Sequence, residues 1–149
     1  MLNIGDKVPH FNFVDQDGNK DNSKNLENKK WVLFFYPKAD TPTCTIEVCN
    51  IRDNYTNLIN SGLLIYGISA DDQRKQFKFK EKHELPFNLI ADSDKSICKL
   101  FGVWGSKNFM GREYEGITRT TFIINEEGII EKVISEVKAK NHAKQILEK

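Results

Sequence analysis

Residues 31–53 read WVLFFYPKADTPTCTIEVCNIRD, a stretch that joins a strand signal to a helix signal. The residues Trp31–Tyr36 are all apolar or aromatic, which is typical of a parallel strand buried on both faces. A helix is expected from residue 42 to about 61, because Pro42 is favoured at the first helical position, where its missing N–H costs nothing. The chain therefore passes from a buried strand into a helix, and α/β proteins place their sites at such junctions.

The rest of the chain alternates short apolar runs with amphipathic stretches. The amphipathic stretches predict helices at about 72–84, 94–101 and 142–148, the last with Asn141 as its N-cap. The apolar runs predict strands at residues 11–14, 63–69, 87–91, 118–125 and 129–137, the last two joined as a hairpin. Strands separated by helices form a parallel sheet, and the terminal hairpin adds antiparallel strands to it. We therefore expect one domain over residues 1–149, an α/β three-layer sandwich with a mixed β-sheet that resembles the thioredoxin-like class.

The chain has 149 residues, with 22 basic and 21 acidic side chains and a formal net charge of +1. This balance argues against a nucleic-acid-binding protein, because neutralising phosphates requires a basic excess or stripe. The basic residues between 74 and 82 are interleaved with Gln76 and Glu81, so we interpret them as a solvated helix face. No apolar run approaches the ~18 residues of a membrane span, and residues 1–6 lack the pattern of a signal peptide. We expect a soluble, cytoplasmic protein.

The three cysteines are Cys44, Cys49 and Cys98. In the cytosol, an odd and small number of cysteines argues against a structural disulfide framework. Cys44 falls in the first turn of the predicted helix, after Thr41 as N-cap, where the helix dipole and free N–H groups stabilise a thiolate over a thiol. Helical spacing also places Cys44 on one face with Val48, Ile51, Tyr55 and Leu58. A partly shielded, reactive Cys44 is thus favoured over an ordinary buried thiol.

Cys49 lies five residues after Cys44. In a regular helix this spacing gives a rise of ~7.5 Å and a rotation of ~140°. A disulfide requires Cα atoms within ~6.8 Å, so the two cysteines cannot bond while the helix is intact. On composition alone, Cys49 and Cys98 are interpreted as inert, packed thiols. No metal is expected, because the cysteines and the histidines at positions 10, 83 and 142 lack close ligand spacing.

The spacing Pro37-x-x-x-Thr41-x-x-Cys44 resembles the active-site motif of peroxiredoxins, which are thiol peroxidases without metal or haem. The wider pattern FYPKA-x-TP-x-CT, with a second cysteine at position 49, is similar to the bacterioferritin comigratory protein group, also called Q-type peroxiredoxins. Essentially the whole chain takes part in the resemblance. Further segments that agree with the group, in the same order, are residues 101–105, 109–111 and 116–119.

The resemblance implies a role for each residue of the site. Cys44 is the expected peroxidatic nucleophile, and Arg119 is the expected arginine that stabilises the thiolate and polarises the peroxide. Thr41 offers a hydroxyl close to the sulfur, and Pro37 shields the sulfur from water. Glu47 stands where many peroxiredoxins have a glutamate that orients the arginine; the alternative is a solvated surface carboxylate.

The resemblance also implies a catalytic cycle. Cys44, once oxidised to a sulfenic acid, condenses with Cys49, which requires local unfolding from about Thr43 to Asn50. The exposed disulfide suits reduction by thioredoxin. The expected activity is antioxidant reduction of hydrogen peroxide and organic hydroperoxides by a monomer without a cofactor. Thr43 stands where the group usually has glycine, and a β-branched residue is stiffer at that turn.

Two other function classes stay open. A thioredoxin-like disulfide reductase uses a C-x-x-C pair, whereas the spacing here is C-x-x-x-x-C. A non-enzymatic binding module on the same fold leaves Cys44 and Arg119 without a chemical role. Consumption of hydrogen peroxide with a thioredoxin system distinguishes the three classes.

Overall fold

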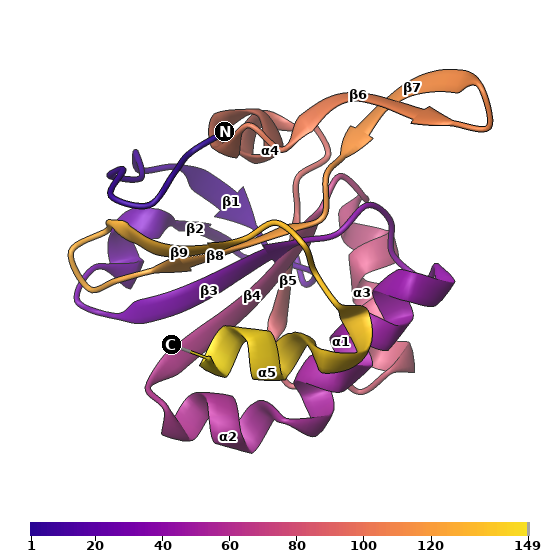
Figure 1. Ribbon diagram of the computed structural model, residues 1–149. Helices are drawn as coiled ribbons and strands as arrows, with labels where there is room; N and C mark the ends of the chain where they lie inside the picture. The colour runs from indigo at the N-terminus through magenta and orange to yellow at the C-terminus, as the bar shows by residue number, and fades with distance from the viewer. Residues whose placement is uncertain (149) are drawn as a thin grey trace.

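A five-stranded mixed sheet forms the centre of the computed structural model, which describes residues 1–148 (Figure 1). Its strand order is β5-β4-β3-β8-β9. The first three strands of this order run parallel, β8 is antiparallel to β3, and β9 is antiparallel to β8, so the predicted mixed sheet and closing hairpin are confirmed. The strand bounds are β3 Lys30–Phe35, β4 Leu63–Ser69, β5 Asn88–Ala91, β8 Thr120–Ile124 and β9 Ile130–Ile134.

The two faces of β3 belong to two separate hydrophobic clusters. Trp31, Leu33 and Phe35 contribute to one cluster, whereas Val32 and Phe34 contribute to the other. All five side chains are buried, as expected for a central strand whose successive side chains point to opposite faces.

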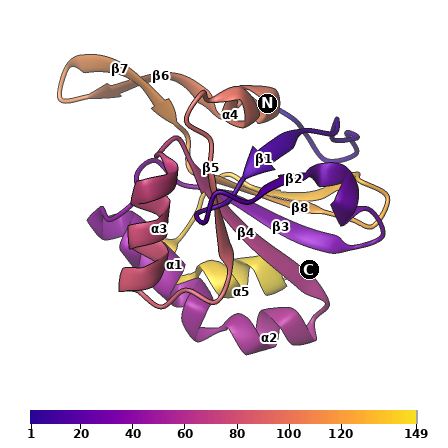
Figure 2. The ribbon, with the colours of Figure 1, turned by 180° about the vertical axis from the view of Figure 1, so that it is seen from behind.

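Helices cover one face of the sheet, and a helix with a small hairpin covers the other (Figures 1 and 2). The first face carries α1 (Pro42–Asp53), α2 (Tyr55–Asn60), α3 (Gln73–Lys82) and α5 (His142–Leu147), with the short 3-10 helix η2 (Ala139–Asn141) before α5. The second face carries α4 (Ser96–Phe101) and the hairpin of β1 (Asn12–Val14) and β2 (Lys20–Asn22), which is followed by the 3-10 helix η1 (Ser23–Leu26). The predicted three-layer sandwich is confirmed.

The single helix predicted from residue 42 to about 61 is wrong, because the chain forms two helices that meet at Asn54. Asn54 has φ −112° and ψ 14°, outside the helical region, and its side-chain amide donates to the carbonyl of Asn50. Asparagine competes with helical hydrogen bonding in this way, which favours it at helix ends. The break leaves α1 as an independent unit of three turns that carries both Cys44 and Cys49.

A third hairpin, of β6 (Trp104–Phe109) and β7 (Arg112–Ile117), was not predicted. It projects away from the central sheet (Figure 1), and most of its side chains are partly or fully exposed, so it lacks the apolar alternation that marks a half-buried strand. Its two-residue turn, Met110 and Gly111, has positive φ at both positions, the conformation that tight hairpins favour.

The strand predicted at 63–69 has those bounds in the structure, the strand predicted at 31–36 is shifted by one residue, and the other predicted elements are confirmed with shorter bounds. The predicted strands 118–125 and 129–137 end sooner at both ends, and the helix predicted from residue 94 begins at Ser96. The basic residues of α3 between 74 and 82 are exposed as expected, except for the half-buried Lys80. Gln76, which was expected on the same solvated face, is completely buried and donates to the carbonyl of Ile90. Within residues 1–148, no helix has the length and apolar character needed to cross a bilayer.

Candidate active site

Cys44 lies in the first turn of α1, just beyond the carboxyl end of β3. Thr41 is the N-cap residue and Pro42 the first helical residue, as predicted. The Thr41 side chain does not cap the helix, since its Oγ1 donates instead to the carbonyl of Lys38 at 2.8 Å. The Cys44 side chain is 1% exposed, so it is more deeply buried than the partial shielding that the sequence predicted.

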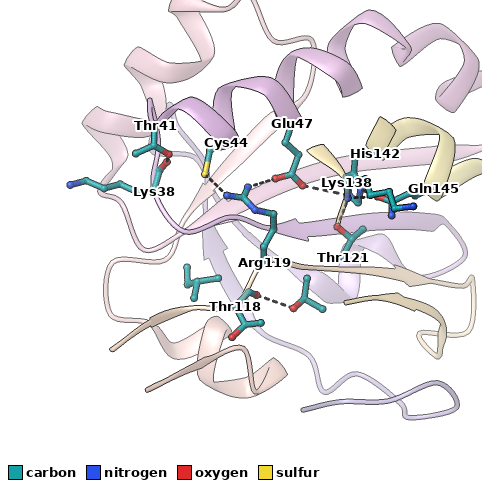
Figure 3. A network of polar contacts seen from close by, with 12 residues as sticks. Lys38, Thr41, Cys44, Glu47, Thr118, Arg119, Thr121, Lys138, His142 and Gln145 are labelled. Carbon is teal, nitrogen blue, oxygen red and sulfur yellow. Dashed lines mark hydrogen bonds and ion pairs between the residues drawn. The ribbon is translucent and has the colours of Figure 1, made fainter. Parts of the chain in front are cut away.

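Arg119 is the residue immediately before β8, and its side chain reaches Cys44. Because Thr120 pairs with Phe35 in the antiparallel register, Arg119 lies next to the end of β3, where α1 begins. Its Nη2 donates to Cys44 Sγ at 3.3 Å, and its Nη1 donates to Glu47 Oε1 at 2.6 Å (Figure 3). One guanidinium therefore binds both the sulfur and the carboxylate of the first turns of α1.

The charges around Arg119 keep it ionised. Burial alone would lower the pKa of the guanidinium, but the Glu47 carboxylate and the Cys44 sulfur outweigh that effect and raise its pKa above the ordinary value. A permanent positive charge therefore lies 3.3 Å from the sulfur of Cys44.

Glu47 lies three residues after Cys44 and is completely buried, which excludes the solvated carboxylate considered for it. Burial raises the pKa of Glu47 to about 7, against the lowering effect of Arg119. Its Oε1 accepts from Arg119, whereas its Oε2 has no hydrogen-bond partner among the described residues and lies 3.5 Å from Nε2 of His142. The carboxylate is held between the arginine of the site and a histidine of α5.

The neighbours of His142 define its tautomer. Its Nδ1 lies 2.9 Å from Gln145 Oε1, which also accepts from the backbone N–H of Lys138, so Nδ1 carries the hydrogen. Nε2 then accepts from the Thr121 hydroxyl at 2.7 Å. Burial lowers the pKa of His142 to about 4, which keeps the ring neutral at ordinary pH. With its hydrogen on Nδ1, the neutral ring offers no donor to Oε2 of Glu47, which lies 3.5 Å from Nε2, and the absence of a donor favours a proton on Glu47.

The sequence of this chain matches known proteins over most of its length. The profile of the AhpC/TSA family matches residues 4–133. The chain is 42% identical over 146 residues to Peroxiredoxin Bcp of Escherichia coli, which covers 98% of this chain and 94% of that protein. This chain belongs to the AhpC/TSA family.

Two further relatives narrow the assignment within the family. Peroxiredoxin Bcp of Bacillus subtilis is 40% identical over 147 residues, covering 99% of this chain and 94% of that protein. The crystal structure of a PrxQ mutant from Xylella fastidiosa superposes with a TM-score of 0.92 at 28% identity, covering 99% of this chain and 94% of the other. The chain is a peroxiredoxin of the Bcp/PrxQ type, a thiol peroxidase that reduces hydroperoxides. The family, the thioredoxin-like fold and the enzyme class predicted from the sequence are confirmed.

The second cysteine of this peroxiredoxin lies on the same helix as the first. Cys49 is half-buried in α1, and its Sγ lies 3.9 Å from Nδ1 of His83. All three cysteines are free thiols. Since α1 is continuous from Pro42 to Asp53, the sulfurs of Cys44 and Cys49 point to different sides of an intact helix.

The other predicted residues take different positions. Pro37 is exposed in the loop between β3 and α1, and its shielding role stays a prediction. Cys98 is completely buried in α4, as expected for a packed thiol, and burial together with the neighbouring Asp92 raises its pKa well above the ordinary range. The peroxiredoxin site thus gathers Cys44, Glu47 and Arg119, with Thr41 at its edge.

The sequence did not predict the positions of two histidines of this peroxiredoxin, because it indicated no role for them other than metal binding, which their spacing argued against. His142 lies behind Glu47, and His83 lies beside Cys49. His142 directly follows the predicted N-cap Asn141, and this position was the only sequence signal for it. The first turn of α5 packs on α1, where the backbone N–H of Ala143 donates to the side chain of Asn50. His83 lies in the last turn of the helix predicted at about 72–84, where nothing in the local pattern indicates a cysteine neighbour.

Proposed function

We propose that Cys44 is the peroxidatic nucleophile of this thiol peroxidase. The observation that supports it most is the Arg119 guanidinium 3.3 Å from the buried sulfur. The thiolate attacks one oxygen of hydrogen peroxide or of an organic hydroperoxide; an S–O bond forms and the O–O bond breaks. The leaving hydroxide or alkoxide takes a proton to become water or an alcohol, and Cys44 is left as a sulfenic acid.

Arg119 stabilises the charge that develops during this attack. Its fork already donates to the sulfur and to Glu47, so a peroxide beside the sulfur meets a fixed, ionised donor. Glu47 holds the guanidinium in place from the next turn of α1. The first N–H groups of α1 supply further donors, the Thr41 hydroxyl oxygen can accept from the peroxide O–H, and Pro37 limits the access of water.

Cys49 is the proposed resolving cysteine. Its thiolate attacks the sulfenic sulfur of Cys44, and the disulfide forms as water leaves. The helix from about Thr43 to Asn50 must first unwind. Asn50 marks the end of this segment, because its side chain donates to the carbonyl of Lys140 at 2.9 Å and accepts from the N–H of Ala143 at 2.8 Å, tying α1 to η2 and α5.

The remaining parts of the cycle follow from the chemistry of such a disulfide. A strained, exposed bond between neighbouring turns is readily reduced by a dithiol, and we propose thioredoxin as the reductant. We also propose that residues 1–149 act as one domain and as a monomer in the cytoplasm, in antioxidant defence and without a metal or cofactor.

Peptide mapping of peroxide-treated protein tests the cysteine roles. One equivalent of hydrogen peroxide is added to reduced protein, free thiols are alkylated, and the digest is analysed by mass spectrometry. The expected product is a Cys44–Cys49 disulfide with Cys98 alkylated. A Cys44–Cys98 disulfide, or Cys44 found only as sulfinic and sulfonic acid, would contradict the proposed resolving step.

A further inference from the structure

Cys49 has a polar environment of its own, separate from that of Cys44. Its Sγ lies 3.9 Å from Nδ1 of His83, and Nε2 of the same ring lies 3.7 Å from Oδ1 of Asp40. His83 Nε2 is buried and has no hydrogen-bond partner within residues 1–148. A thiol, an imidazole and a carboxylate thus follow one another in the order that serves to activate a nucleophile.

We propose that His83 is the general base that removes the proton from Cys49 in the resolving step, and that Asp40 stabilises the resulting imidazolium. The inference rests on the proposed role of Cys49 as the resolving cysteine. It adds a second activated thiol to the one that Arg119 serves.

The geometry requires one tautomer of His83. Nδ1 faces the sulfur and must be unprotonated to accept the thiol hydrogen, so Nε2 carries the ring hydrogen. Nε2 lies 3.7 Å from Oδ1 of Asp40, so the carboxylate acts on the ring through its charge rather than through a hydrogen bond. The imidazole side chain is 17% exposed and the Asp40 side chain 54% exposed, so solvent weakens this effect and Asp40 contributes less than His83.

The resolving step proceeds by transfer of one proton and exchange of one bond. The thiol proton of Cys49 passes to His83 Nδ1, and the thiolate attacks the sulfur of the Cys44 sulfenic acid. The S–S bond forms as the S–O bond breaks, and the leaving hydroxide takes a proton from the imidazolium or from solvent to become water. Cys49 is oxidised, and Cys44 is reduced from sulfenic acid to disulfide.

His83 and Asp40 both lie outside the segment of α1 that must unwind. His83 is the C-cap residue of α3; its ring packs edge-on against Phe79 at 5.3 Å, and its carbonyl accepts from Arg52 Nη1 at 2.8 Å. Asp40 lies in the loop before α1 and binds Lys82 Nζ at 3.0 Å. The base therefore keeps its position while Cys49 leaves the helix as a thiolate.

Other charged groups lie near both Cys49 and Asp40. Arg52 of α1 lies one helical turn after Cys49, and its pKa is raised by its hydrogen bond with Asp53 and, more weakly, by Cys49 and Glu84. Lys82 of α3 partly neutralises Asp40 and lowers the pKa of that carboxyl group, together with His83. The relay therefore combines an ionised carboxylate with a cation beside the thiol.

Rapid-quench kinetics tests the inference in the Cys98→Ser protein. Reduced enzyme is mixed with one equivalent of hydrogen peroxide, quenched with acid, and the sulfenic acid and the Cys44–Cys49 disulfide are quantified by mass spectrometry. Since a thiol with an ordinary pKa of ~8.5 is only about 3% ionised at pH ~7, we expect His83→Gln to slow disulfide formation about 10-fold at that pH. Sulfenic acid formation stays unchanged.

The pH profile separates a base from a merely structural residue. The difference between His83→Gln and the parent protein should close above pH ~9, where thiols ionise without help. Asp40→Asn should slow disulfide formation about 3-fold with the same pH profile; asparagine tolerates the positive φ of 61° at this exposed position, so folding is preserved. His10→Gln, which removes an exposed histidine paired with Glu27, is the matched control and should have no effect.

Each failure has its own signature. Equal disulfide rates in His83→Gln and the parent protein, or a difference that is the same at every pH, would overturn His83 as the base and leave Cys49 as the resolving cysteine. If the parent protein forms no Cys44–Cys49 disulfide, the resolving role proposed for Cys49 fails, and this inference fails with it.

Discussion

Cys44 and Cys98 are buried to the same degree but lie in opposite electrostatic surroundings. The side chains are 1% and 0% exposed, and each lies in the first turn of a helix, α1 for Cys44 and α4 for Cys98. Cys44 receives a hydrogen bond from the Arg119 guanidinium, whereas Cys98 lies beside the Asp92 carboxylate.

The first turns of α1 and α4 also differ in whether their backbone N–H groups are already occupied by a negative side chain. Asp92 accepts from the backbone N–H groups of Ile97 and Cys98, at 3.1 and 2.8 Å, and so occupies the donors at the start of α4 with a negative charge. At the start of α1, the Thr41 side chain turns to the carbonyl of Lys38 and leaves the first-turn donors free of a side-chain cap. Burial alone therefore does not make a cysteine reactive; the sign of the nearest charge and the availability of helix N–H groups do.

The largest difference between the two cysteines should appear when each is replaced by serine. Cys44→Ser should lower the rate of hydroperoxide reduction by at least ~10³-fold, because a hydroxyl at this position is almost never ionised. Cys98→Ser should leave the rate within about twofold of the parent protein. Peroxide consumption with thioredoxin and thioredoxin reductase measures both. Cys44→Ser with full activity, or Cys98→Ser with a comparable loss, would remove the distinction between the two sites.

The next largest effect should come from the charge that distinguishes Cys44. Arg119→Lys keeps a positive charge but loses the fork that holds the sulfur and Glu47 together, so we expect the second-order rate constant for hydrogen peroxide to fall about 10²-fold. Stopped-flow measurement of peroxide consumption provides the number, and circular dichroism shows whether the fold is kept. A rate constant within twofold of the parent protein would contradict the proposed role of Arg119.

The sequence predicted the position of Cys44 in the fold, because that position depends on local patterns. The start of α1 at Thr41 and Pro42 is a local pattern, and the apolar run of β3 identified the central strand, so Cys44 was placed correctly. Arg119 and Glu47 came from the resemblance to peroxiredoxins, since their contact depends on the register of β8 against β3. Contacts between distant segments leave no trace in helical or strand periodicity.

The missed features share that physical reason. His142 meets Glu47 because α5 packs on α1, and His83 meets Cys49 because α3 ends beside α1; neither packing is written in the local pattern. The hairpin of β6 and β7 escaped prediction because an exposed strand pair needs no apolar face. The division of the predicted helix at Asn54 depends on one competing side-chain amide.

The smallest predicted effect concerns the buried carboxyl group of Glu47 and the buried imidazole of His142, whose pKa values burial shifts in opposite directions. Folding raises the pKa of Glu47 from 4.5 to about 7, so the folded state keeps a proton that the unfolded chain loses, and the stability that Glu47 contributes falls as pH rises through this window. Folding lowers the pKa of His142 from 6.5 to about 4, so its contribution rises as pH rises from about 4 to 6.5. The two slopes oppose each other where the windows overlap.

Single substitutions should therefore unmask opposite pH dependences of the free energy of unfolding. Relative to the parent protein, His142→Gln should lose stability as pH rises from about 5 to 6.5, and Glu47→Gln should gain it, each by up to about 1 kcal/mol per pH unit. Urea unfolding at several pH values measures the slopes, and taking the difference from the parent protein removes the titration of other groups. Parallel slopes in the two variants would contradict the opposite pKa shifts of Glu47 and His142. Opposite slopes would support a proton held on the buried carboxyl group that binds Arg119, whereas the carboxylate beside Cys98 accepts from backbone N–H groups instead.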